Sequence, residues 1–307
     1  MRALGICGKV GKWVHNFLSN RRQFILANGT ISKESHVTSG VPQGTVLGPI
    51  LFLIMINDIN KNVSNASKVS MFADDTRVMR HVDNENDVED LQKDLDTIYD
   101  WQSQNNMLFN SRKFEILRYG SNEDLKNSTD YLTHEYEEFI EVKENLRDRG
   151  IIMSDKGTFS EHIKHVCSKV NQKNSWILRT FRSREANFMK CMWKTLVQGH
   201  LDYCSQLYLP NQASDLQKLE NLQKCFTKKI PALRDLNYWE RLKALKMYSQ
   251  QRRLERYRIL YTWKILEGLV PNCGIEELNS DRRGRETKIP MLKGNKQSVK
   301  SLREQSF

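Results

Sequence analysis

The chain has 307 residues, and 48 Lys and Arg against 37 Asp and Glu give it a formal net charge of +11 at pH 7. This length suits about two domains, and the basic excess favours a polyanionic partner, either nucleic acid or an anionic membrane surface, although it can also serve solubility alone. The six cysteines form no Cys-x-x-Cys pair, which argues against a zinc module or a disulfide scaffold and favours an intracellular compartment, nuclear or cytoplasmic.

The first 60 residues predict a helix, a hairpin, a loop and a second helix. Residues 10–18 are predicted as helix, and two β-like runs joined by Asn28 and Gly29 carry a strong hairpin signal. The Gly/Pro-rich stretch GVPQGTVLGP then leads into an apolar segment, which we interpret as a helix from its length. The apolar run from Val46 to Ile56 is too short to span a bilayer. We therefore predict no membrane segment, and no secretory signal is expected at the start.

Two adjacent carboxylates, Asp74 and Asp75, lie between short β-like runs in MFADDTRVM. Asp is favoured in tight turns, so the pair can be an ordinary hairpin tip. The same pair can instead hold Mg²⁺, which prefers hard oxygen ligands. Because a two-metal site needs further acid from elsewhere in the chain, the pair alone leaves both interpretations open.

The region after this hairpin predicts one long helix and then strands. Apolar residues recur at three- and four-residue steps, so residues 87–104 are predicted as an amphipathic helix. KFEILRY and EFIEVKENLRDRGIIM are predicted as strands, and the polar residues 120–137 between them as a loop. An α+β unit over residues 1–155 follows from these elements.

From residue 159 onward the apolar periodicity is almost wholly helical. Four stripes predict helices with core-facing residues: Ile163 to Phe181, Phe188 to Leu201, Leu216 to Phe226 and Leu254 to Tyr261. In QRRLERYRILYTWK, residues 251–264, basic and aromatic residues alternate. That pattern suits either a surface that tracks phosphates and stacks on bases or a helix with aromatics in the core and arginines in water. The tail over residues 276–307 is basic, polar and predicted to be disordered.

Several sequence motifs follow one another in a characteristic order. They are SGVPQGTVLGPILFLIMINDI at 39–59, FADD at 72–75, NNMLFNSRK at 105–113 and RGIIMS at 149–154. Their order and spacing resemble those of reverse transcriptases from jockey-like non-LTR (LINE-type) retrotransposons, and the likeness covers nearly all of residues 1–270. The resemblance implies a partial right-hand polymerase palm at 1–155, an antiparallel sheet with helices, followed by an all-helical thumb and C-terminal extension at 156–275.

The same resemblance implies a reaction, a cofactor and partners. The reaction is two-metal nucleotidyl transfer, in which deoxynucleoside triphosphates are added to a DNA primer along an RNA template. The implied cofactor is Mg²⁺ or Mn²⁺, and the implied partners are the RNA template, the primer and the nucleotides. The resemblance does not indicate an oligomeric state.

Roles for individual residues are also implied by the resemblance. Asp74 matches the main metal-ligating acid of the palm hairpin and Asp75 its neighbour, and Lys113 matches a lysine thought to protonate the pyrophosphate leaving group. The implied nucleotide-binding residues are Ser39, Gly40, Pro42, Gln43, Gly44, Phe72 and Ala73. The implied primer and template contacts are Arg21, Arg22, Gln23, Arg149, Gly150, Ile151, Arg252, Arg253 and Arg256.

Taken without the resemblance, each of these segments also has a purely structural interpretation. The loop from Ser39 to Gly44 can be a helix-entry turn, and Lys113 can be a solvated lysine at the start of a strand. Residues 149–151 can be a strand with a glycine bulge. Charged residues such as Arg21 and Arg22 often belong only to the surface.

The third carboxylate of such a palm comes, in this family, from an upstream strand with an F-D motif. No Asp or Glu occurs here before Glu34, and neither Glu34 nor Asp58 matches a catalytic position of the family. We therefore expect a truncated retroelement product that lacks the first-Asp strand and is inactive alone. The alternative is a non-catalytic module that binds RNA or an RNA–DNA duplex.

Overall fold

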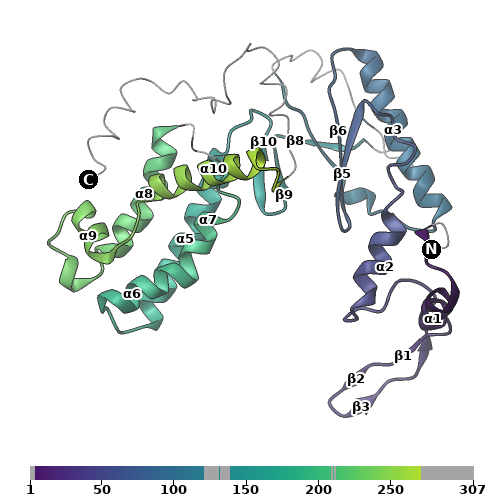
Figure 1. Ribbon diagram of the computed structural model, residues 1–307, viewed down its shortest axis with the longest axis horizontal. Coiled ribbons are helices and arrows are strands. Elements are labelled where there is room, and N and C mark those ends of the chain that lie inside the picture. The colour runs from purple at the N-terminus through teal and green to yellow at the C-terminus, as the bar shows by residue number, and fades with distance from the viewer. Residues whose placement is uncertain (1–3, 121–130, 132–138, 209, 211, 271–307) are drawn as a thin grey trace. The chain divides into compact units, whose positions relative to one another are not determined.

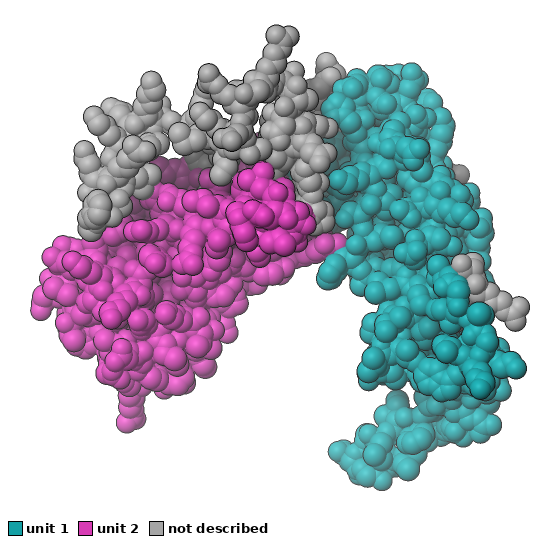
Figure 2. Space-filling model, in the orientation of Figure 1, with its two compact units in different colours: residues 1–146 teal, residues 147–307 magenta. Residues whose placement is uncertain are grey.

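The computed structural model describes residues 4–120, 131, 139–208, 210 and 212–270. The chain separates into two compact units, residues 1–146 (unit 1) and residues 147–307 (unit 2), shown in Figure 2. The predicted tail at 276–307 and most of the predicted loop at 120–137 lie outside the described residues. Among the helices that are described, none has the length and apolar character needed to cross a membrane.

Unit 1 begins with one helix and one extended hairpin. Helix α1 spans Gly8–Leu18, and two antiparallel ladders follow: β1 (Arg22–Gln23) with β4 (Ser35–His36), and β2 (Leu26–Ala27) with β3 (Thr30–Ile31). Asn28 and Gly29 both have positive φ, 50° and 79°, which is the conformation that a two-residue type I′ turn requires. The predicted helix and Asn-Gly hairpin are confirmed (Figure 1).

Helix α2 spans Leu47–Ile56 and begins close to the glycine-rich loop before it. A side chain at Gly48 would place its Cβ only 2.6 Å from the Pro42 carbonyl oxygen, so glycine is required there. Thr45 Oγ1 donates to that same carbonyl at 2.8 Å and accepts from the Gly48 N–H at 3.1 Å. The helix predicted from the apolar run is confirmed, and its first turn is locked to the loop.

A regular hairpin follows α2. Strands β5 (Ser67–Phe72) and β6 (Asp75–Arg80) pair antiparallel along their whole length, with Phe72 opposite Asp75 at the tip. The chain reverses in a two-residue turn at Ala73 and Asp74, and Ala73 takes a positive φ of 52°. The hairpin predicted around the Asp-Asp pair is therefore present in the structure.

Helix α3 spans Glu85–Gln104 and begins two residues earlier than predicted. A capping box starts it: Asn84 accepts from the Asp87 N–H, and the Asp87 carboxylate accepts from the Asn84 N–H. Two N–H groups that would otherwise lack helical partners are satisfied, so the first turn forms ahead of the apolar stripe.

Arg80, at the end of β6, joins the hairpin to α3. Its guanidinium lies 3.0 Å from the Asp90 carboxylate and 3.4 Å from that of Asp94, which is nearly fully buried. Asp94 also accepts from Ser67 Oγ at 2.5 Å and from the Ser64 N–H at 2.7 Å. The base of the hairpin is therefore held to α3 by charge-assisted hydrogen bonds, which are stronger than neutral ones.

The core beneath this hairpin is small. Its buried residues are Ile56, Ile59, Ile98 and Trp101. Trp101 donates its indole N–H to Asp58 at 2.8 Å, which joins α3 to the end of α2. On α2, by contrast, Ile50 and Leu53 are 49% and 50% exposed. The apolar segment is thus buried on one side only.

The remaining strands of unit 1 are short. Strand β7 (Glu115–Leu117) pairs with β8 (Glu141–Lys143) in parallel, and the strands within the described residues form separate two-stranded ladders. The α+β class is confirmed, but the expectation of one antiparallel sheet is corrected for this part of the chain. The long connection over residues 118–140 allows parallel pairing, which a tight hairpin turn cannot connect.

Unit 2 opens with a hairpin and continues as helices, with the unit boundary falling inside the first strand. Its elements are β9 (Asn145–Asp148), β10 (Ile151–Ser154), α5 (Ser160–Thr180), α6 (Ala186–Met192), a π-helical segment (Trp193–Val197), α7 (Gln198–Asp202), α8 (Ala213–Thr227), α9 (Tyr238–Leu245) and α10 (Gln250–Leu266). Helix α9 was not predicted, because eight residues carry too short an apolar stripe. The helices predicted at the other four stripes are confirmed (Figure 1).

The core of unit 2 is larger and centres on α5 and the helix that follows it. Val170 and Ile177 of α5 are fully buried, as are Met189, Trp193 and Val197. The first part of the stripe predicted from Phe188 to Leu201 was one residue out of phase, since the fully buried positions start at Met189, whereas Leu201 is buried as predicted. A π turn holds more residues than an α-helical turn, so buried side chains four residues apart stay on one face.

His162 fastens the β9–β10 hairpin to α5. Its side chain is buried, its Nδ1 accepts from the Ile152 N–H at 3.3 Å, and its ring meets Tyr208 edge to face with centroids 4.7 Å apart. Burial, with the nearby positive charges of His165, Lys169 and Arg147, lowers the pKa of His162 to about 4. The imidazole is therefore neutral at pH 7 and serves as an acceptor.

Replacing Asp94 with Ala should lower the local free energy of unfolding of the hairpin by roughly 3 kcal/mol, because the Arg80 charge stays buried with weaker compensation. Native-state hydrogen exchange of the β5 and β6 amides measures this loss. Asp100→Asn, an exposed acid on the same helix, is the control and should change little. Equal protection in both variants would contradict the anchoring role of Asp94.

Acidification should destabilise unit 2 through His162. Between about pH 6.5 and pH 4 the unfolded chain takes up a proton at this histidine and the folded chain does not, so stability falls as pH is lowered through that window. The loss should reach up to about 3 kcal/mol, at 1.36 kcal/mol per pKa unit. Urea unfolding followed by circular dichroism measures it at pH 7.5, 5.5 and 4.5.

His162→Gln keeps an acceptor toward Ile152 without the titrating ring, so it should flatten this pH dependence. The exposed His200→Gln is the matched control and should keep the wild-type profile. A profile as steep in His162→Gln as in the control would show that other groups cause the acid sensitivity.

Candidate functional site

The tip of the β5–β6 hairpin presents two carboxylates to solvent. Asp74 occupies the second turn position, Asp75 is the first residue of β6, and both side chains are exposed. Because the turn contains only two residues and Arg80 fixes the hairpin base, the place of both carboxylates is set by the β ladder. Phe72, opposite Asp75, is 61% exposed.

The donor set at this tip fits Mg²⁺ in its chemistry. Carboxylate oxygens are the ligands that this ion prefers, and it commonly binds one or two carboxylates together with waters and substrate phosphates. Among the described residues no group of three or more His, Cys, Asp or Glu side chains is arranged as a metal site. The tip thus offers two exposed carboxylates, Asp74 and Asp75, as candidate metal ligands.

The glycine-rich loop from Ser39 to Gly44 is held from below by Arg21. The Arg21 guanidinium donates to the carbonyl oxygens of Ser39 at 3.3 Å and Gly40 at 2.5 Å. Gly40 and Gly44 both have a φ of 77°, a conformation that side chains disfavour. The structure therefore brings Arg21 together with the loop, where it supports the backbone.

The neighbouring residues of Arg21 lie on the exposed hairpin. Arg22 pairs with Glu34 at 3.3 Å, and both side chains are more than half exposed. An exposed pair of this kind contributes at most about 1 kcal/mol. Gln23 is also exposed. These two side chains remain accessible to a partner.

Lys113 ends a short 3₁₀ turn, Ser111–Lys113, that leads into β7. Its side chain is exposed, while the next residue, Phe114, packs edge to face against Tyr99 with centroids 5.7 Å apart. Lys113 lies in the same compact unit as Asp74 and Asp75. The aromatic contact fixes the turn, and the lysine itself points to solvent.

The remaining predicted residues belong to unit 2. Arg149 and Gly150 form the β9–β10 turn with φ of 45° and 85°, and Ile151 is buried beneath it. Tyr203 packs against this turn. Its hydroxyl donates to the Arg149 carbonyl at 2.8 Å, and a Cβ at Gly150 would lie 3.5 Å from its ring. The nearby Cys204 raises the pKa of Tyr203 above its usual value. The sequence alone did not predict this role for Tyr203.

Of the three predicted arginines on α10, one forms an ion pair within the protein. Arg253 donates to Asp202 of α7 at 2.6 Å, and Tyr257 donates to the same carboxylate at 3.1 Å. Arg252 lies over the Tyr248 ring, 5.4 Å from its centroid, and Arg256 is exposed. Arg253 thus ties α10 to α7, whereas Arg252 and Arg256 lie at the surface.

Some residues that shape the candidate site carried only weak sequence signals. One face of α3 carries acidic residues at three- and four-residue steps, namely Asp87, Asp90 and Asp94. This face lies against Arg80, the last residue of β6. An acidic stripe of this spacing beside a strand-end arginine indicates an ion-pair network, although it is also typical of a solvated helix face. Only the three-dimensional contact separates the two.

Comparison with known proteins connects this geometry to a family. Residues 1–139 match the family model described as reverse transcriptase (RNA-dependent DNA polymerase). A probable RNA-directed DNA polymerase from transposon X-element of Drosophila melanogaster is 23% identical over 215 residues, which are 68% of this chain and 23% of that relative. The RNA-directed DNA polymerase from mobile element jockey of Drosophila funebris is 26% identical over 233 residues, 71% of this chain and 24% of the relative.

The jockey polymerase of Drosophila melanogaster is 25% identical over 224 residues, 68% of this chain and 24% of its own. The chain thus spans about a quarter of the length of the curated relatives that it matches. The family match covers the glycine-rich loop, the Asp-Asp hairpin and Lys113. The chain is therefore related to the reverse transcriptases of jockey-like non-LTR mobile elements.

Proposed function

We propose that this chain is part of an RNA-directed DNA polymerase and that Asp74 and Asp75 are its metal ligands. The observation that carries the proposal is the pair of exposed carboxylates at a two-residue turn, inside the region that matches the reverse transcriptase model. In this proposal residues 1–155 are a partial palm and residues 156–275 a helical thumb with its extension. The partners are an RNA template, a DNA primer and deoxynucleoside triphosphates.

Each proposed role follows from the chemistry of the reaction. Bound Mg²⁺ or Mn²⁺ would neutralise triphosphate charge and favour attack by the primer 3′-hydroxyl. The backbone of residues 39–44 lies open for a nucleotide, because its glycines carry no side chains, and Gln43 offers an amide for a base or sugar. Lys113, an exposed ammonium, is proposed to give a proton to the leaving pyrophosphate.

Phe72 and Ala73 border the carboxylates and are proposed to contact the nucleotide. The accessible side chains Arg22, Gln23, Arg252 and Arg256 are proposed to contact primer or template. The turn at 149–151 is proposed to hold the primer end, with Tyr203 keeping that turn in place. Arg21 and Arg253 would act by supporting a loop and a helix.

We further propose that the 307-residue chain does not extend a primer by itself. A two-metal site depends on several carboxylates that act as a unit. Residues 1–33 contain no Asp or Glu that could serve as the third ligand. The second candidate function is a non-catalytic module that binds RNA or an RNA–DNA duplex. The exposed Arg252 and Arg256 on α10 and the net charge of +11 favour it.

Removing both carboxylates should weaken metal binding. Asp74→Asn with Asp75→Asn should lower Mn²⁺ affinity by about tenfold or more, since liganding oxygens lose their charge. Electron paramagnetic resonance titration of free Mn²⁺ measures this without any reaction. Asp83→Asn with Asp100→Asn removes the same charge from exposed positions elsewhere in unit 1 and should leave affinity within about twofold. An equal loss of Mn²⁺ affinity in both double variants would contradict the proposal that Asp74 and Asp75 are the ligands.

Primer extension on an RNA template with Mg²⁺ or Mn²⁺ should yield no template-dependent product from the isolated chain, since in this proposal Asp74 and Asp75 lack the third carboxylate of a two-metal site. Product that appears with the wild-type chain and disappears with Asp74→Ala would overturn the proposed inactivity and support the polymerase role. Absence of product with salt-sensitive RNA binding that survives Asp74→Ala would favour the binding module.

A further inference from the structure

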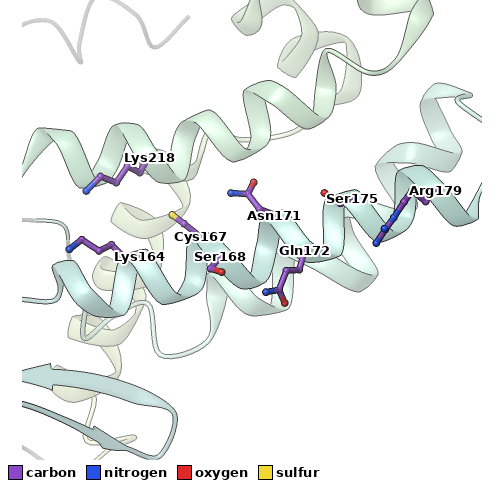
Figure 3. Close-up of a pocket in the computed structure, with 8 residues that line it drawn as sticks. All are labelled: Lys164, Cys167, Ser168, Asn171, Gln172, Ser175, Arg179 and Lys218. Carbon is purple, nitrogen blue, oxygen red and sulfur yellow. The ribbon is translucent and has the colours of Figure 1, made fainter.

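An open groove of about 710 Å³ runs along the solvent face of α5, with α8 on its other side. Figure 3 shows its lining side chains arranged in a row along α5, with Lys218 contributed by α8. The α5 residues that line it extend from Lys164 to Arg179, which corresponds to about 22 Å of helix at 1.5 Å per residue. This feature, the α5 groove, contains none of the residues discussed above.

Cations lie at both ends of the α5 groove. Lys164 and Lys218 are near one end and Arg179 is near the other (Figure 3). Lys164 pairs with Glu161 at 2.5 Å, and Lys218 with Asp215 at 2.7 Å. None of the described residues that line the groove carries a carboxylate. Its electrostatic character is therefore cationic, although the two lysines are partly compensated.

Asp215 holds the ammonium group of Lys218 in place, and this group keeps donors for a further anion. Although burial alone would raise it, hydrogen bonds from Lys218 and Ser160 lower the pKa of Asp215, so this buried carboxylate is ionised. An ammonium group has three donors, and Asp215 accepts one of them. The side chain of Lys218 is 46% exposed. The ammonium is thus anchored on the protein side and open on the solvent side.

The floor between the cations is polar and uncharged. Ser168, Asn171, Gln172 and Ser175 are exposed and recur at three- and four-residue steps, which places them on one face of α5. Hydroxyl and amide groups both donate and accept hydrogen bonds. Burial raises the pKa of the Cys167 thiol at the edge, so that group stays neutral. A ligand with alternating anionic and hydroxyl groups matches this arrangement.

We propose that the α5 groove binds the sugar–phosphate backbone of a single nucleic-acid strand. The length of the groove corresponds to about six nucleotides of a stacked strand, at 3.4 Å each. Cations at its ends would meet phosphates, and the hydroxyl and amide groups would meet sugars or phosphates between them. The inference rests on the proposed function in one respect, that nucleic acid is the partner of the chain.

Ser168 and Ser175 offer a charge test with a matched control. Ser168→Asp with Ser175→Asp places carboxylates in the groove, four residues from Lys164 and Arg179, where they repel phosphate and pair with these cations. Ser168→Asn with Ser175→Asn has nearly the same size, polarity and helix propensity without the charge. Both positions are exposed, so either variant should fold.

Fluorescence anisotropy of the full chain with labelled single-stranded RNA of four to twelve nucleotides measures binding. We expect the Asp variant to lose about tenfold in affinity at 50 mM salt and to lower the salt slope by about 1.4, since the two carboxylates pair with two cations and each cation that neutralises a phosphate contributes roughly 0.7. The Asn variant should stay within about twofold of wild type. Affinity should stop rising near six nucleotides, and single-stranded DNA of equal length shows whether the 2′-hydroxyl matters.

Photocrosslinking with 4-thiouridine RNA gives a local readout. Crosslinks on peptides that contain residues 164–179 or Lys218 would support the proposal. RNA binding that is equal in the Asp and Asn variants, with crosslinks elsewhere, would overturn the groove but leave the proposed function standing. No RNA binding by the wild-type chain would overturn both. Labelled polyglutamate that binds with the same dependence on the variants would assign the groove to acidic peptides and overturn the proposal.

Discussion

The buried charge of Arg80 is the constraint on which the candidate site depends. A guanidinium left without a partner in the interior would cost several kcal/mol, so β6 can end there only if the acidic face of α3 lies against it. That contact fixes the base of the hairpin. The β5–β6 register then fixes the position of the two-residue turn relative to that base. The same hairpin therefore pairs the Arg80 charge with carboxylates at one end and leaves Asp74 and Asp75 exposed at the other.

Helix α5 has a comparable division of roles in unit 2. One face supplies Val170 and Ile177 to the core, where neither is accessible to solvent. The opposite face carries hydroxyl, amide and cationic groups that line the α5 groove. Since the apolar face fixes the helix by packing, the polar face can be occupied by a ligand without rearranging the core. A rigid helix thus presents an ordered row of polar groups.

The elements with strong local signals were predictable, and those that depend on distant contacts were not. Asn28–Gly29 needs only its own φ preferences to form a turn, and the long stripes of α3 and α5 show their period within the sequence. Helix α9 is too short to show one. The parallel pairing of β7 with β8 depends on how residues 118–140 connect them, and the half-exposed face of α2 depends on what packs beside it.

The sequence by itself determined the order of motifs, the hairpin that carries Asp74 and Asp75, and the chain's relation to reverse transcriptases, because these depend on residue types and short spacings. Only the tertiary structure decided the partners of individual side chains. It placed Arg21 under the glycine-rich loop, Arg253 against Asp202, Tyr203 over the turn at Gly150 and Lys218 beside α5. A charged side chain in a sequence has the same appearance whether it faces solvent or a carboxylate more than 50 residues away, as Arg253 does, and only the folded chain brings the two together.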